Sequence, residues 1–294
     1  MMRSNEDIYF SVKVIFAIVN IFLSPLIIFA VVKKRVLQTS PNLFLCSLCV
    51  FCLIFECLDI ASFIAKGFYD KVRVFQEILL TSSPLLLSVT AYARYRLVSE
   101  PYKKQISKLW SLSTAFLIFV YSASVAILSS VNTFHYRAVY DVASIIIRCV
   151  IPFVVITICH IQIVRLLTKQ NEKIKICKVM ASARCVQGLR RKQRLKRLLL
   201  AILLVFLTTS CPLETLKLLT LTHVYDVGES YRKIVELSAI NGTLLTPLIY
   251  AWWNDSLKRE VFKILSKFIC KQYRKFSYSS YVSVSMRIRR NSEV

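Results

Sequence analysis

The sequence predicts an all-α membrane protein, a seven-transmembrane helix bundle with a short amphipathic helix after the seventh span. Three observations predict this fold. Hydrophobic residues make up 56% of the 294-residue chain, and the mean hydropathy of +0.56 is too high for a soluble domain of this size. Seven apolar segments are each long enough to cross a bilayer, which takes about 20 helical residues. The basic residues behind the formal net charge of +24 mostly lie between these segments.

The positive charge falls on one side of the predicted bundle. Essentially all of it is carried by four segments, residues 32–41, 93–109, 165–197 and 254–294. Loops rich in Lys and Arg stay in the cytoplasm, which predicts a multi-pass membrane protein with its N-terminus on the outer side. The basic residues flank apolar spans rather than a soluble fold, so binding to nucleic acid is not expected.

The first four spans are bounded by short polar segments. They cover residues 8–32, 42–65, 72–98 and 110–131. Residues 1–7 are predicted to be an extracellular N-terminus. The basic residues Lys33 to Arg35 end the first span, which lacks a small-residue cleavage site and is expected to remain as a signal anchor.

The last three spans each contain a proline. They cover residues 141–167, 195–221 and 234–253, so the predicted seven-span domain is 8–253. Pro152, Pro212 and Pro247 are tolerated in membrane helices, and the mid-span prolines are expected to kink them. Residues 168–192, dense in Lys and Arg, form the longest predicted loop.

A short amphipathic helix is predicted at 254–271, where Asn254 or Asp255 can cap it. Its apolar residues recur at helical spacing, with lysine and arginine between them: Leu257, Val261, Ile264, Leu265 and Phe268. This pattern is typical of a helix lying on an anionic inner leaflet. Cys270 is either a palmitoylation site or a plain free thiol. Residues 272–294 are expected to form a disordered cytoplasmic tail.

The sequence holds no pattern typical of an enzyme. The ten cysteines lie mostly inside apolar spans, and their spacing fits neither a disulfide framework nor a zinc site. The three histidines are scattered, and no nucleophile motif or phosphate-binding loop is visible. We therefore expect no catalytic residues, no cofactor and no metal.

Several ionisable residues lie in the outer half of the predicted bundle, where lipid would penalise them. They are Glu56, Asp59, Glu77, Arg148, Glu214, Lys217 and Glu236. Glu214 and Lys217 share one helix face, which favours an ion pair. Such residues either stabilise the bundle or line a polar ligand pocket at its outer mouth. The candidate ligand-binding residues are Gln76, Glu77, Arg148, Glu214, Lys217 and Glu236.

Two segments at the inner ends of spans carry a family resemblance. AYARYRLVSEPY (91–102) and TPLIYAWWNDSLKREVFKIL (246–265) resemble the Asp-Arg-Tyr and Asn-Pro-x-x-Tyr segments of the rhodopsin-like (class A) G protein-coupled receptors. The matching residues, in chain order, are Asn20, Arg94, Tyr95, Pro101, Pro152, Phe206, Pro212, Pro247 and Tyr250. The resemblance covers about residues 10–270. Several family positions differ, and the replacements are Cys52, Ala93, Ser210 and Thr246, so the chain is similar to a divergent member.

The resemblance implies a multi-pass receptor of the plasma membrane, with an extracellular N-terminus, that passes an extracellular ligand signal to a heterotrimeric G protein. Arg94 would bind the G protein C-terminus, although it could instead only reach lipid phosphate. The residues expected to take part in coupling or activation are Arg94, Tyr95, His160, Phe206, Pro212, Pro247 and Tyr250. For His160, Phe206 and Tyr250 the alternative is ordinary packing within the bundle. Because Ala93 replaces the acid that holds this arginine in the family, we expect high ligand-free signalling.

The resemblance also disfavours two ligand classes. Gln76 stands where amine receptors carry an aspartate, and Ile240 stands where opsins carry the retinal lysine. The alternative from another functional class is a non-signalling membrane scaffold or heterodimer partner of other receptors, and a receptor dimer is a further expected partner. A transporter would need repeats or broken helices, which the sequence does not show.

Overall fold

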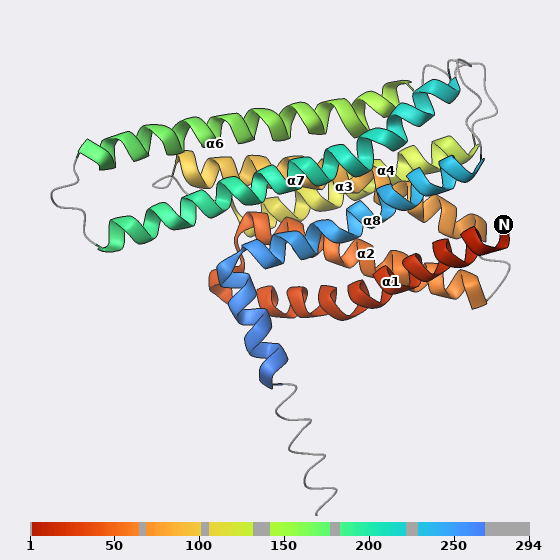
Figure 1. The fold of residues 1–294 in the computed structure, drawn as a ribbon, viewed down its shortest axis with the longest axis horizontal. Coiled ribbons are helices and arrows are strands. Elements are labelled where there is room, and N and C mark those ends of the chain that lie inside the picture. The colour runs from red at the N-terminus through yellow and green to blue at the C-terminus, as the bar shows by residue number, and fades with distance from the viewer. Residues whose placement is uncertain are drawn as a thin grey trace, which may run out of the picture.

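The protein folds as a bundle of long helices (Figure 1). The structure, a computed structural model, describes residues 2–64, 69–100, 106–131, 142–176, 183–221 and 229–267. Among these, seven helices are long and apolar enough to cross a membrane, which confirms the predicted fold class. In lipid the backbone must satisfy its own hydrogen bonds, and α-helices do so within one segment. The helices are α1 (Met2–Lys33), α2 (Ser40–Ile64), α3 (Tyr69–Ser99), α4 (Lys108–Val131), α6 (Ile151–Ile176), α7 (Ala183–Leu221) and α8 (Glu229–Trp253).

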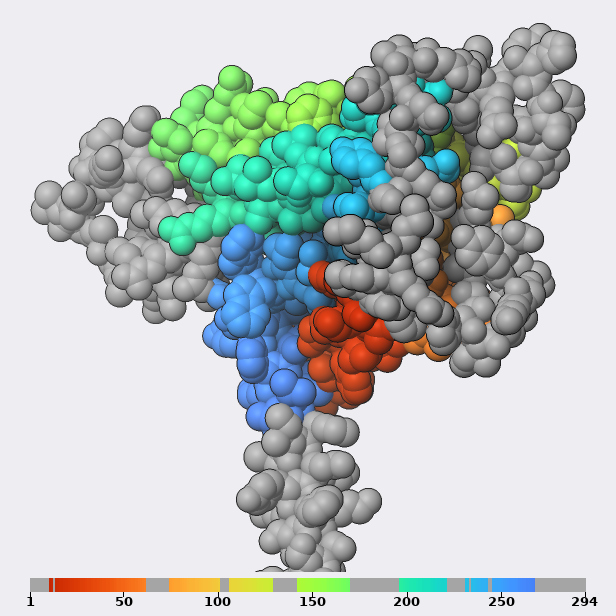
Figure 2. Space-filling view, turned by 45° about the vertical axis from the view of Figure 1, so that its right-hand side comes forward, coloured from red at the N-terminus to blue at the C-terminus, as the bar shows by residue number. Residues whose placement is uncertain are grey.

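The third span lies at the centre of the bundle. Of its membrane-crossing residues 61% are buried, the largest share of any span, and α3 packs against α2, α4, α6 and α8. On one face α6, α7, α8 and α1 follow one another side by side (Figure 2). Residues on α3 can therefore contact most of the other helices.

The bundle is apolar on the outside and partly polar within. Large apolar side chains on α4 and α6 point away from the bundle: Leu112, Phe116, Leu117, Val154 and Ile158. Several polar side chains are buried instead: Asn20, Ser24, Thr81, Ser82 and Ser122. Four of them donate a side-chain hydrogen bond to a carbonyl of the preceding turn: Asn20, Thr81, Ser82 and Ser122. This arrangement suits a lipid solvent, which penalises exposed polar groups.

Two helices extend well beyond the predicted membrane boundary. The basic segment 168–192 was predicted to be a loop, but α6 continues to Ile176 and α7 begins at Ala183. In Figure 1 both helices project past their neighbours at the end of the bundle opposite the N-terminus. Lysine, arginine and glutamine are strong helix formers, and charge ends a membrane span without ending a helix. At the other end α1 begins at Met2, so the helix includes residues predicted to be a tail.

A π-helical turn, η3 (Ile146–Val150), precedes α6. The N–H of Ile151 donates to the carbonyl of Ile146, five residues back. Pro152 has no N–H, and in a regular α-helix its ring would crowd the carbonyl four residues earlier. The wider turn accommodates the proline and changes which side chains face the bundle interior. Arg148, in the middle of this turn, is buried.

A short helix at residues 255–267 follows α8 and runs across the bundle axis (Figure 1). Asn254 caps it, since its side-chain oxygen accepts the N–H of Leu257 at 3.4 Å. Leu257 is fully buried, and Val261 and Ile264 pack against the same core. The apolar face predicted for the membrane surface thus partly covers the bundle itself. Phe262 and Trp252 stay exposed and contact each other.

Glu260 tethers this helix to the segment after α1 by an ion pair with Lys34. Lys34 lowers the pKa of the Glu260 carboxyl below its ordinary value of 4.5. A carboxyl with a lowered pKa stabilises the folded state above its ordinary pKa and loses that contribution as pH falls through the lowered value. Amide hydrogen exchange in residues 255–267 should therefore accelerate, beyond the intrinsic pH effect, as pH falls below about 4.5, and should not show this extra change above that pH. Glu260→Gln should remove this extra change, and an unchanged pH response would contradict the tether.

Candidate functional site

Arg94 and Tyr250 meet at the end of the bundle from which the helix at 255–267 departs. Arg94 lies in the last turns of α3, and Tyr250 lies in the last turn of α8. The Arg94 Nε donates to the Tyr250 hydroxyl at 3.1 Å, and the guanidinium carbon lies 4.3 Å from the centre of the phenol ring. Tyr250 is completely buried, whereas Arg94 is half-buried. The arginine is thus held by a neutral hydroxyl and a ring face.

Two asparagines extend this contact to other helices. The Tyr250 hydroxyl donates to Asn42 Oδ1 at 3.0 Å, and Asn254 Nδ2 donates to the same oxygen at 3.3 Å. Asn42 Nδ2 in turn donates to the carbonyl of Leu37 at 2.8 Å. We call Arg94, Tyr250, Asn42 and Asn254 the Arg94 site. It links α3 and α8 to the start of α2 and to the cap of the helix at 255–267.

Ala93, the residue before Arg94, has an apolar side chain and lies among apolar side chains. Ala93 is 1% exposed and belongs to a core cluster that includes Ala115 on α4. The neighbouring arginine, Arg96, pairs with Glu100 at 3.1 Å. Among the described residues, Arg94 is held by Tyr250 and not by an acid.

The other residues expected to take part in activation lie on α3, α6, α7 and α8. Tyr95 packs against the same core cluster as Tyr250, and Phe206 is buried in α7. His160 is half-buried on α6, and its Nδ1 is buried without a hydrogen-bond partner. Pro212 and Pro247 lie inside α7 and α8. Cys270 lies outside the described residues.

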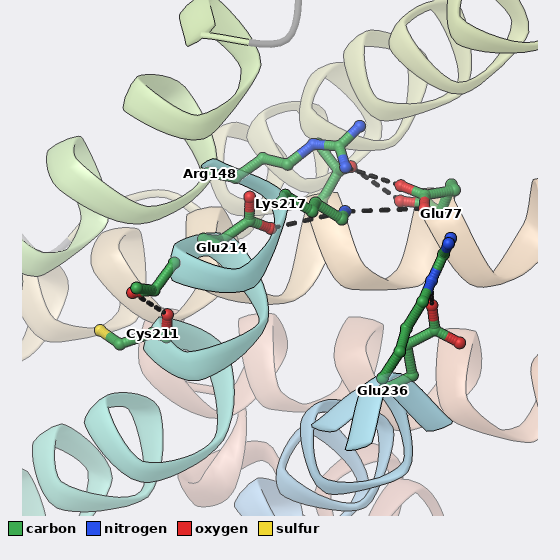
Figure 3. A network of polar contacts seen from close by, with 9 residues as sticks. Glu77, Arg148, Cys211, Glu214, Lys217 and Glu236 are labelled. Atoms are coloured by element: carbon green, nitrogen blue, oxygen red, sulfur yellow. Dashed lines mark hydrogen bonds and ion pairs between the residues drawn. The ribbon is translucent and has the colours of Figure 1, made fainter. Parts of the chain in front are cut away.

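Four charged residues form a second site towards the opposite end of the bundle (Figure 3). Arg148 Nη1 donates to Glu77 Oε2 at 2.6 Å. Lys217 Nζ lies 3.7 Å from Glu77 Oε1 and 3.7 Å from Glu214 Oε1, so the predicted pairing of Glu214 with Lys217 is present. We call Glu77, Arg148, Glu214 and Lys217 the Glu77 cluster. It joins α3, η3 and α7 through charges of alternating sign.

Among the described residues, two atoms of the Glu77 cluster have no hydrogen-bond partner. Arg148 Nε and Glu214 Oε2 are buried without hydrogen-bond partners. A buried polar atom left unpaired costs about 1–3 kcal/mol. A polar group of a ligand could accept a hydrogen bond from Arg148 Nε or donate one to Glu214 Oε2.

Two of the predicted ligand-binding residues stand apart from this cluster. Glu236, seen apart from the cluster in Figure 3, pairs instead with Arg232 at 3.1 Å; the Arg232 side chain is exposed and Glu236 is half-buried. Gln76 is half-buried on α3, next to Glu77 in sequence. The structure therefore brings together Glu77, Arg148, Glu214 and Lys217, but not Glu236.

Asn42 has a role that the sequence did not indicate. Asn42 lies at the start of an apolar span, where a polar residue is common. Its role is visible only from its hydrogen bonds with Tyr250 and Asn254, which are more than 200 residues away in the sequence. The contact of Cys149 with Cys211 was missed for the same reason, since 62 residues separate them.

The fold, with seven apolar helices among the described residues, is that of a multi-pass membrane protein. Residues 25–250 match the family described as 7 transmembrane receptor (rhodopsin family), so the chain belongs to that family. It is therefore a G protein-coupled receptor of the plasma membrane, as the resemblance implied.

Two similar proteins are named as peptide receptors. The chain is 22% identical over 288 residues to a Neuropeptide F receptor of Drosophila melanogaster, a match covering 82% of this chain and 59% of that protein. It is 24% identical over 279 residues to a QRFP-like peptide receptor of Branchiostoma floridae, covering 82% of this chain and 72% of that protein.

Proposed function

We propose that this receptor binds a peptide at the Glu77 cluster and couples to a heterotrimeric G protein at the Arg94 site. The proposed orientation in the membrane places the N-terminus outside the cell and the basic ends of α6 and α7 in the cytoplasm. The contact between Arg94 and Tyr250 carries the coupling proposal. It keeps a cation at the cytoplasmic end of the central helix without neutralising it by a carboxylate. The names of the two similar receptors support a peptide ligand.

The proposed mechanism is a shift between two arrangements of the bundle. In the resting arrangement Arg94 stacks on Tyr250 and donates to its hydroxyl. Ligand binding changes the ion pairs among α3, η3 and α7, and the cytoplasmic ends of α6 and α7 separate. Arg94 then exchanges Tyr250 for acceptors at the C-terminus of the G protein. Residues Phe206, His160 and Pro212 lie on the helices that move.

Receptor-stimulated nucleotide exchange tests the proposal. Purified receptor in lipid should accelerate exchange on at least one class of Gα, and Arg94→Ala should reduce that rate by about tenfold or more, since charge-assisted hydrogen bonds to the partner are lost. Arg96→Ala is the matched control, because Arg96 lies on the same helix end but pairs with Glu100. Its rate should change less than about twofold. Absence of exchange with every Gα class would favour the alternative, a non-signalling scaffold or heterodimer partner.

Ligand-free activity should be high and should fall in Ala93→Asp. A ring contact contributes about 0.5–2 kcal/mol, and an added aspartate would hold Arg94 more strongly in the resting arrangement. Stabilising the resting arrangement by a further 1–2 kcal/mol lowers the ratio of active to resting receptor by roughly 5–30-fold. Basal exchange per folded receptor should therefore drop several-fold in Ala93→Asp. Ala93→Asn, similar in size but uncharged, controls for the disturbance of the buried position. Equal basal rates in the two variants would count against the missing acid as the cause.

A further inference from the structure

Two cysteines from different spans lie against each other beside the Glu77 cluster. Cys149 is in the π-helical turn η3, and Cys211 is on α7 immediately before Pro212. Their sulfur atoms are 3.7 Å apart, within S–H···S hydrogen-bond distance, and both are free thiols. Among the described residues no second pair of cysteines makes such a sulfur–sulfur contact.

The geometry points to a modification site: we propose that Cys149 and Cys211 form a disulfide when the membrane contains an apolar organic hydroperoxide. A disulfide requires sulfur atoms about 2.0 Å apart, so the present separation must close by less than 2 Å. This proposal is independent of the proposed function, because it needs neither a ligand nor a G protein.

The position of the pair in the membrane selects the oxidant. Both cysteines lie within membrane-crossing segments, residues 142–169 and 196–220. Each is only half-buried, and Ile146 and Val150 in the same turn are exposed on the apolar surface. A hydroperoxide on an apolar carbon skeleton partitions into this region, whereas hydrogen peroxide prefers water.

The reaction balances with one hydroperoxide for each disulfide. One cysteine sulfur attacks the terminal oxygen of the hydroperoxide, the O–O bond breaks, and the alcohol leaves with the thiol proton. The resulting sulfenic acid is attacked by the second sulfur, so the S–S bond forms and the S–O bond breaks. The hydroxyl group leaves as water with the second thiol proton. Two thiols lose two electrons and two protons in total, and the hydroperoxide is reduced to alcohol and water.

The cross-link would act directly on the Glu77 cluster. Cys149 follows Arg148 in sequence, and Cys211 lies about one helical turn before Glu214, along the α7 segment shown in Figure 3. A bond between the two sulfurs fixes the distance between η3 and α7 at this level. It therefore limits how far Arg148 and Glu214 can separate.

Peptide mapping of the full-length receptor in lipid nanodiscs tests the proposal with cumene hydroperoxide as the probe. After treatment, alkylation of the remaining thiols and tryptic digestion, the peptide of residues 149–165 should be joined to the peptide of residues 198–217. The joined species should disappear on reduction with dithiothreitol. The midpoint of thermal unfolding of the treated receptor should rise by several degrees and return on reduction.

Single serine variants decide which sulfurs react, because residues 149–165 also contain Cys159. Cys149→Ser and Cys211→Ser should each abolish the joined peptide, whereas Cys159→Ser should leave its yield unchanged. Equal unfolding midpoints of the untreated variants would show that all three fold. The proposal is overturned if both thiols remain open to alkylation after peroxide treatment, if oxidation stops at sulfinic acid, or if Cys159 forms the cross-link.

Discussion

Replacing Glu77 with glutamine should lower the stability of the detergent-solubilised receptor by about 2–3 kcal/mol. This is less than the loss of about 3–5 kcal/mol when one partner of a fully buried ion pair is removed, because the Glu77 side chain is 31% exposed. Arg148 is only 5% exposed, and its guanidinium donates to the Glu77 carboxylate at 2.6 Å. Lys217 lies 3.7 Å from the same carboxylate. The substitution therefore leaves two cations near each other with Glu214 as the remaining acid of the cluster. The midpoint of thermal unfolding measures the loss.

Two further variants test whether the loss of stability comes from the ion pair between Glu77 and Arg148. Glu236→Gln breaks the more exposed pair with Arg232, so its effect should stay within about 1 kcal/mol. Glu77→Gln combined with Arg148→Met removes both charges of the buried pair and should recover much of the loss, because no uncompensated guanidinium remains. If Glu77→Gln is no more destabilising than Glu236→Gln, the Glu77 cluster does not hold the bundle together.

Gly242→Ala should destabilise the bundle at the contact of α7 with α8. A β-carbon at Gly242 would lie less than 3.0 Å from the side chain of Thr209, a separation that real β-carbons essentially never show. Alanine is a better helix former than glycine by about 1 kcal/mol, so any loss of stability must come from this overlap. Overpacking of a buried contact typically costs about 1–3 kcal/mol. The midpoint of thermal unfolding should therefore fall.

Compensating changes at Thr209 test the steric explanation. The overlap involves the Thr209 β-carbon as well as its hydroxyl and methyl groups. Gly242→Ala with Thr209→Gly should therefore regain stability relative to Gly242→Ala alone, whereas Thr209→Ala, which keeps the β-carbon, should help little. Similar midpoints for the two double variants would mean that the helices adjust in another way.

The spans were predictable because each depends on its own composition. An apolar segment of about 20 residues must form a helix in lipid, whatever its neighbours are. The ends of the helices were less predictable. The charges at residues 168–192 mark where the chain leaves the membrane, but α6 and α7 continue as helices on both sides of residues 177–182. Charge decides the membrane boundary, whereas helix propensity and capping decide where a helix stops.

The sequence could predict which charged residues are candidates for the sites, but not which of them pair with each other. The cost of charge in lipid indicated that Glu77, Arg148, Glu214 and Lys217 would face inwards and pair. It equally suggested Glu236, whose partner proved to be Arg232 on its own helix face. Which pairs form depends on how each helix is rotated about its axis, and for Arg148 on the π-helical turn before Pro152.

The sequence by itself determined the class of molecule: seven spans, the position of the basic segments, and the receptor family to which the chain belongs. Only the tertiary structure decided that Arg94 is held by Tyr250, that Asn42 supports this contact, and that Cys149 lies against Cys211. The physical reason is the range of the interactions. Burial in lipid acts on each segment separately, whereas hydrogen bonds and ion pairs act over about 3 Å and require helices distant in sequence to be packed in one register.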